Sequence, residues 1–259
     1  MAVTTKDSIG ALRKAHEETA AIVDGLDEKG LVAQSGAAEW TVAQVLSHLG
    51  SAAEIARSTL LAGKRDEEGV QPVWDRWDAM APAEQASNFV EFESRLVEAL
   101  EALDDNELSS KRIDVGFLPA PIDVGFFVGM RLSEVALHGW DVEVAFDGDA
   151  TVRSYLVPFV LERLPLFAGF FAKPIGKAGK VAIETSEPSR FYLLELREDG
   201  ASLSEETQPP TGAGTRIEMP GESLLRLTAG RLSPERTPSK VTVQGELSLD
   251  DIRKVFPGY

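Results

Sequence analysis

Four ionisable residues recur at helical spacing in a short stretch of the chain. Arg131, Glu134, His138 and Asp141 follow one another at intervals of three, four and three residues, so on a helix they share one stripe. Apolar neighbours predict that this helix is half buried, where unpaired charge costs free energy. Glu134 and His138 can share a metal ion, which Asp141 or Arg131 would then support by orienting the ligands. An ion pair on a solvated helix face is the alternative.

A second histidine lies on another strongly predicted helix. Thr41 and Gln44 have the spacing of a capping box, and Trp40 and Val45 that of a hydrophobic staple, so a helix is expected to begin at this point. In this register His48 falls on the same inward-facing side as Val45. The sequence therefore places a histidine on an apolar helix face.

The chain has only three histidines, and two of them, His48 and His138, are predicted on apolar faces. This coincidence favours one shared site. His16 is surrounded by charged residues and is expected to be an ordinary surface or hydrogen-bonded histidine. Two histidines and Glu134 would leave at least one coordination position open, which is the pattern of catalytic zinc. The same ligands also serve ferrous iron, so they do not by themselves select the metal.

Composition limits the function further. The net charge of −16 argues against binding to nucleic acid or to an anionic membrane. The chain has no cysteine, so any thiol chemistry needs a thiol from outside. No apolar run follows a basic start, and charges and prolines interrupt the most apolar stretch, 155–175, so neither a signal peptide nor a membrane span is expected. A cytoplasmic protein is predicted.

Hydrophobic periodicity changes near residue 175 from helical to alternating. Before this point an irregular connection is expected over 63–82 and a loop over 109–125. The other segments before it are predicted as helices: 6–26, one from 41, 83–103, the Glu134/His138 helix and 151–171. After it the pattern predicts strands at 181–185, 191–196, 201–203, 215–219 and 240–245, and helices at 221–229 and 249–255. The predicted class is α+β, with domains at 1–175 and 176–259.

Several motifs together resemble the mycothiol-dependent maleylpyruvate isomerase family. They are Trp40-Thr41-Val42 followed by His48-Leu49, the helix carrying Arg131, Glu134, His138 and Asp141, and Gly-Arg-Leu at 230–232. The resemblance covers essentially the whole chain. It implies a DinB-like up-and-down helical bundle that binds metal over 1–175, followed by a small α+β sterol carrier-like domain over 176–259.

The resemblance also implies a chemistry. His48, Glu134 and His138 would bind zinc or another divalent metal, and mycothiol would be the thiol cofactor. As thiolate it would add to the double bond of maleylpyruvate, the resulting single bond would rotate, and elimination of the thiolate would give fumarylpyruvate. Related members instead transfer the thiol to an electrophile. The partners would be this thiol and a small electrophilic substrate, without nucleic acid or membrane, and the protein would be a monomer or weak dimer.

Arg231 and Asp141 are the expected catalytic residues. An arginine of the second domain would bind a substrate carboxylate, since its planar fork suits that group. Arg231 is the first choice and Arg226 the second. A surface arginine near a helix end is an equal alternative for each.

Two other functions remain open. A metal-dependent hydrolase or iron oxygenase would use the same three ligands. In a non-enzymatic regulatory or ligand-binding protein, a fourth ligand, for which Asp141 is the candidate, would close the zinc site.

Overall fold

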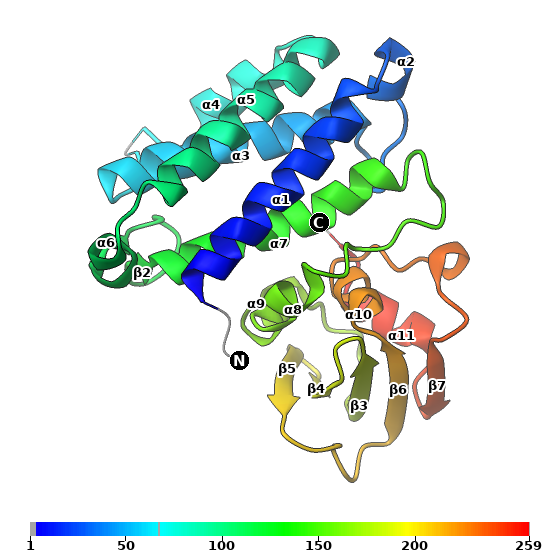
Figure 1. The fold of residues 1–259 in the computed structure, drawn as a ribbon. Coiled ribbons are helices and arrows are strands. Elements are labelled where there is room, and N and C mark those ends of the chain that lie inside the picture. Colours follow the sequence, from blue (N-terminus) through cyan, green and yellow to red (C-terminus); the bar gives the residue numbers. More distant parts are fainter. Residues whose placement is uncertain (1–3, 67, 259) are drawn as a thin grey trace. The chain divides into compact units, whose positions relative to one another are not determined.

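The computed structural model describes residues 4–66 and 68–258, and these form two compact units, 1–150 and 151–259. The first unit is helical and the second combines a sheet with helices (Figure 1). This confirms the expected α+β class. The division falls between Ala150 and Thr151, earlier than the boundary expected near residue 175. The reason is that the helices between these positions pack within the second unit, against β5 (Gly200–Glu206) and α10 (Gly221–Thr228).

The first unit is built on four long helices. They are α1 (Thr5–Asp24), α3 (Val42–Ala62), α5 (Pro82–Glu101) and α7 (Val124–Glu143). Helix α3 contacts α5, α5 contacts α1, α1 contacts α7, and α7 contacts α3. Each long helix therefore has two long neighbours (Figure 1). The buried apolar residues of all four form a common core.

Shorter elements connect these helices. They are α2 (Glu28–Leu31), α4 (Gln71–Asp78), α6 (Asp105–Ser110), β1 (Arg112–Ile113) and β2 (Ile122–Asp123). Helix α4 is a difference from the sequence-based expectation, and α6 lies mostly in a segment, 104–108, for which no element was predicted. The segment 63–82, expected to be irregular, contains α4 because Trp77 packs into the core with no exposed surface. The segment around 109–125 holds a short antiparallel ladder between β1 and β2.

The second unit contains a five-stranded sheet in the order β5-β4-β3-β6-β7. The strands are β3 (Gly179–Ser186), β4 (Arg190–Arg197), β5 (Gly200–Glu206), β6 (Thr215–Pro220) and β7 (Thr242–Gly245). Strands β3 and β6 pair in parallel, and the other neighbours pair antiparallel. All five predicted strands are present.

Helices pack within this unit against the sheet and against each other: α9 contacts β5, and α10 contacts β3, β6 and α8. They are α8 (Val157–Leu161), α9 (Leu164–Phe171), α10 (Gly221–Thr228), the 3-10 helix η1 (Pro234–Arg236) and α11 (Leu249–Val255). The single helix expected over 151–171 is two short helices, because Pro158 and Pro165 each lie in the first turn of a new one, where proline is tolerated. In the described part of the chain, no helix combines the length and the apolar character that a bilayer crossing demands.

Candidate metal centre

The first site residue, His48, is positioned by a well-capped helix. Thr41 Oγ1 accepts a hydrogen bond from the backbone N–H of Gln44 at 3.3 Å, and Gln44 Oε1 accepts one from that of Thr41 at 2.8 Å. This is the predicted capping box, and it fixes where α3 begins. The side chain of His48 is 31% exposed, so it reaches both the bundle and solvent.

Glu134, His138 and Asp141 lie on α7, which contacts α3. The carboxylate of Asp123 caps the start of α7 by accepting a hydrogen bond from the N–H of Phe126 at 2.7 Å. The side chain of Glu134 is 38% exposed, whereas those of His138 and Asp141 are buried. The stripe thus runs from the surface into the interior.

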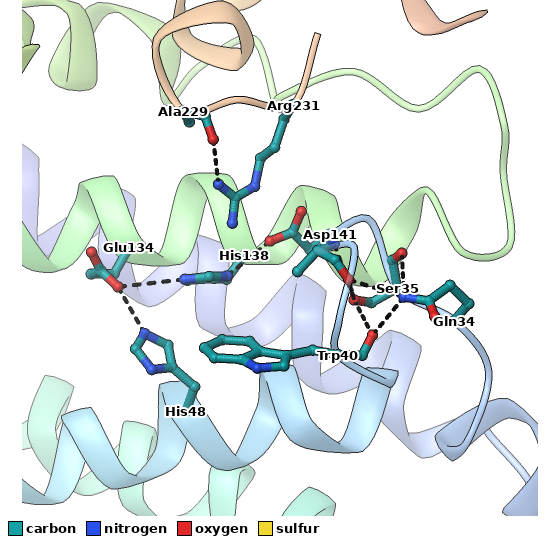
Figure 2. A network of polar contacts seen from close by, with 10 residues as sticks. Gln34, Ser35, Trp40, His48, Glu134, His138, Asp141, Ala229 and Arg231 are labelled. Carbon is teal, nitrogen blue, oxygen red and sulfur yellow. Dashed lines mark hydrogen bonds and ion pairs between the residues drawn. The ribbon is translucent and has the colours of Figure 1, made fainter. Parts of the chain in front are cut away.

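The structure brings three of these side chains together (Figure 2). His48 Nε2 is 3.0 Å from Glu134 Oε2, and His138 Nε2 is 3.6 Å from the same oxygen. One ligand atom from each of the three residues lies within 4.8 Å of the other two. Residues 86 positions apart in the chain therefore form a single cluster.

This donor set fits a zinc ion. Tetrahedral zinc with bonds of about 2.0–2.1 Å separates its ligand atoms by about 3.3 Å, close to the two distances measured to Glu134. The nitrogen and oxygen donors are those that zinc accepts. Because the side chains of His48 and Glu134 are partly exposed, a further ligand from solvent has a path to the cluster.

Asp141 fixes the proton of His138. Its Oδ2 is 2.8 Å from His138 Nδ1. A buried carboxylate accepts hydrogen bonds, so Nδ1 carries a proton in both the neutral and the charged ring, and Nε2 is the nitrogen that faces Glu134. Asp141 thus contacts the edge of the imidazole opposite the cluster, which is the place of a residue that orients a ligand.

The carboxyl of Glu134 is ionised at neutral pH. Burial of the group raises its pKa, but the hydrogen bond with His48 and the charges of His138, His48 and Arg131 outweigh this effect and lower the pKa of Glu134 to about 2. A carboxylate is the form that binds a cation.

Trp40 is a site residue that the sequence pattern assigned to a different role. Its indole ring lies 5.2 Å from the His48 ring and is stacked on the His138 ring at 6.0 Å between centroids (Figure 2). The expected staple pairs Trp40 with Val45, whereas these ring contacts place it beside both histidines. The sequence signal for this role is the position of Trp40 directly before the capping box. An aromatic residue at that position lies beside the side chains of the first turns of the helix.

The loop before α3 holds Trp40 and also meets Asp141. The carbonyl of Trp40 accepts hydrogen bonds from Gln34 Nε2, Ser35 N and Ser35 Oγ. The N–H of Gly36 donates to the carbonyl of Asp141 at 2.8 Å. A Cβ at Gly36 would lie 2.8 Å from Asp141 Oδ1 and 2.9 Å from its Cα, so this close approach requires glycine.

The other predicted residues have different surroundings. Arg131 is buried and binds Glu93 and the carbonyl of Leu49 instead of a cluster residue. His16 is buried against the ring of Phe89, with centroids 6.0 Å apart, and burial lowers the pKa of its imidazole. His16 therefore lies in the core and not at the surface, because it faces α5 from α1.

Both arginine candidates lie in the second unit. Arg226 is buried and donates to both carboxylate oxygens of Glu222, four residues earlier in α10, and to the carbonyl of Arg236. Arg231 Nη1 donates to the carbonyl of Ala229 at 2.9 Å (Figure 2).

Comparisons with known proteins agree with this fold. The family model described as the mycothiol maleylpyruvate isomerase N-terminal domain matches residues 12–143, a range that contains the whole cluster. The chain is similar to the crystal structure of the mycothiol-dependent maleylpyruvate isomerase, with a TM-score of 0.66, 14% identity and 95% of each chain covered. A histidine-to-alanine mutant of that enzyme gives the same TM-score and coverage at 13% identity. No curated protein sequence matches the chain.

Proposed function

Because the chain belongs to the mycothiol maleylpyruvate isomerase N-terminal domain family, we propose that it is a zinc- and mycothiol-dependent enzyme acting on a small electrophilic substrate. One observation carries the proposal. Ligand atoms of His48, Glu134 and His138 come from two helices and lie within 4.8 Å of one another. The absence of cysteine from the chain agrees with a sulfur nucleophile supplied by a cofactor.

The three ligand residues would hold the metal, and Asp141 would act through His138. When bound, zinc would lower the pKa of a thiol in its open position and keep it as the nucleophilic thiolate. The hydrogen bond from His138 Nδ1 to Asp141 keeps the Nε2 lone pair available for the cation. Glu134 supplies a negative charge, which partly neutralises the cation.

The contact between Asp141 and His138 also argues against a closed structural site. Asp141 was the candidate for a fourth ligand in a non-enzymatic protein. Its carboxylate is bonded to Nδ1, whereas His138 Nε2 is the atom that faces Glu134. Its place supports the role of orienting His138 and leaves a position for an external ligand.

We assign substrate binding to Arg231. Its backbone N–H donates to the carbonyl of Arg226 at 2.7 Å, at the end of α10. Gly230 before it has a φ of 72°, and a Cβ there would lie 2.4 Å from Gly258 Cα. The backbone before Arg231 thus packs closely against Gly258, and a well-packed support suits an arginine that offers its fork to a carboxylate. Arg226 is less suited, because Glu222 already occupies its fork.

Titration of purified zinc-loaded protein with mycothiol, followed by an assay with maleylpyruvate, tests the proposal. Binding of mycothiol and formation of fumarylpyruvate are expected for an isomerase. Binding without turnover would favour thiol transfer to another electrophile. Hydrolysis or oxygenation without any thiol would replace the proposal by the hydrolase or oxygenase alternative, and a protein that binds neither zinc nor mycothiol would refute it.

A further inference from the structure

A buried ion pair joins three of the four long helices at the level of the cluster. Arg131 on α7 donates through Nε to Glu93 Oε1 at 3.2 Å and through Nη2 to Glu93 Oε2 on α5. The same Nη2 donates to the carbonyl of Leu49 on α3 at 2.8 Å. The side chain of Arg131 is 4% exposed and that of Glu93 is fully buried.

The two ends of this connection lie beside the metal-ligating residues. Leu49 directly follows His48 in α3, and Arg131 lies one turn before Glu134 in α7. A helix turn is stiff, so a shift of α3 against α7 at Leu49 would carry His48 away from Glu134. Helix α5 contributes no ligand to the cluster, but its Glu93 holds the guanidinium in the orientation that reaches Leu49.

Stability alone does not account for this arrangement. Replacing a buried ion pair by apolar residues of similar volume is often neutral or stabilising, because two charges must lose their hydration. Arg131 Nη1 is moreover buried without a hydrogen-bond partner among the described residues, which adds to the cost. Such a pair is best explained by the geometry that it fixes. A bidentate fork to Glu93 with a third bond to Leu49 ties the three helices together at this level.

We infer that Arg131 and Glu93 are positioning residues that set the separation of His48 from Glu134 and His138 in the metal centre. The inference rests on the proposed function. Neither residue contacts a metal ligand through a hydrogen bond given by the structure; they act through the backbones of α3 and α7. A ligand cluster must be held to within about 0.5 Å to bind its ion tightly, and this ion pair supplies that restraint.

The double variant Glu93→Leu/Arg131→Met tests the inference, because it removes both charges and leaves neither one unpaired. Zinc affinity is measured by competition with a chromophoric chelator. We expect a folded bundle, with a melting temperature no lower than that of the parent, and a loss of about 10- to 100-fold in zinc affinity, as for other residues that orient metal ligands.

The control is Glu222→Leu/Arg226→Met, which removes a similarly buried pair in α10 of the second unit. Its zinc affinity should equal that of the parent. Unchanged zinc affinity in a folded Glu93→Leu/Arg131→Met variant would overturn the inference. If that variant does not fold, Arg131→Lys becomes decisive: it keeps the charge and loses the fork, and parental zinc affinity in it would equally overturn the inference.

A second readout separates this inference from the proposed function. The rings of His48 and His138 have centroids 4.7 Å apart, so in the metal-free parent their protons should give a nuclear Overhauser effect. We expect this effect to weaken in Glu93→Leu/Arg131→Met and to persist in Glu222→Leu/Arg226→Met. A parent that fails to bind zinc would refute the proposed function, whereas an Overhauser effect unchanged by the first variant would refute the positioning role.

Discussion

The two units use buried charge in different ways. In the first unit, polar contacts join residues far apart in the chain: 38 positions separate Arg131 from Glu93, 82 separate Arg131 from Leu49, and 86 separate His48 from Glu134. In the second unit, Arg226 and Arg231 bond to residues close to them in the chain. Arg226 reaches back four positions to Glu222 and forward ten to Arg236, and Arg231 reaches back two to Ala229.

The difference indicates where geometry between helices matters. Local pairs stabilise an element that already exists, whereas pairs between distant helices fix how the elements lie against one another. The whole of the net charge of −16 also falls in the first unit. The unit that carries the candidate metal ligands is thus also the acidic one.

Removing one partner of each buried pair should give the largest contrast. Arg131→Met leaves Glu93 charged and fully buried, and we expect the first unit to lose ~3–5 kcal/mol of unfolding free energy. Arg226→Met should cost the second unit roughly 1–2 kcal/mol, because Glu222 lies in the first turn of α10, where the helix dipole favours its charge.

Urea unfolding measures both losses separately. All four tryptophans lie in the first unit, so their fluorescence follows that unit, while far-ultraviolet circular dichroism follows both. Equal losses in Arg131→Met and Arg226→Met would remove the proposed difference between the units.

Glu134→Gln should empty the metal centre without unfolding the bundle. The amide keeps the size of the side chain but supplies no charge, and Glu134 is partly exposed, so the packing of the bundle is retained. We expect zinc affinity to fall by more than about 100-fold, beyond the range for residues that only orient ligands. Zinc content after gel filtration measures the loss. Glu98→Gln, on the exposed side of α5, is the matched control, and stoichiometric zinc in both variants would exclude Glu134 as a ligand.

Gly36→Ala should lower zinc affinity by a smaller factor, because it acts through Asp141. The added methyl group would meet Asp141 Oδ1 at 2.8 Å, so either the loop or the carboxylate must move and the bond to His138 weakens. We expect a loss of about 10-fold in zinc affinity, at the lower end of the range for indirect effects. A Cβ at Gly10 meets nothing within 4 Å, so Gly10→Ala is the control, and equal affinities in the two variants would show that the loop does not position Asp141.

The smallest expected effect is a pH dependence of stability in the metal-free protein. The pKa of Glu134 falls from 4.5 to about 2, since the effects of His48, His138 and Arg131 exceed that of burial. The pKa of Asp251 falls from 3.8 to about 2 through hydrogen bonds with Lys177 and with Ser248, the cap of α11. Both values are depressed, so each group's stabilisation is complete above its unfolded pKa and is lost as pH falls towards 2.

Glu134→Gln should therefore flatten the pH dependence of stability between pH 5 and 2 when unfolding is followed by fluorescence. Asp251→Asn should flatten the pH dependence of stability followed by circular dichroism. Salt should weaken the contribution of Asp251 more, because the side chain of Lys177 is half exposed. If salt weakened the contributions of Glu134 and Asp251 equally, the proposed difference between the two units would be contradicted.

Much of the local structure could be predicted from sequence patterns. The capping box of Thr41 and Gln44 located the start of α3, and alternation located all five strands of the sheet. The helix with Trp77 was missed, because the apolar residues of α4 are few and the glycines and prolines around it are typical of a loop. His16 was misplaced because its sequence neighbours are charged, although its side chain faces α5.

The candidate site was partly predictable. The spacing of Glu134, His138 and Asp141 was enough to place them on one stripe of a helix. Nothing in the sequence pairs Glu93 with Arg131 or places Gly36 beside Asp141, since these partners lie 38 and 105 positions apart. The sequence pattern around Trp40 fits both packing at a helix start and contact with two histidines, and it does not distinguish these two roles.

The sequence by itself determined which residues could do chemistry and which helices and strands carry them, because caps and periodicity act over a few neighbouring positions. Only the tertiary structure decided that His48 meets Glu134 and His138, that Asp141 lies behind His138, and that Arg131 joins α3, α5 and α7. These contacts depend on how whole helices pack, and packing is the sum of many weak interactions spread over the chain.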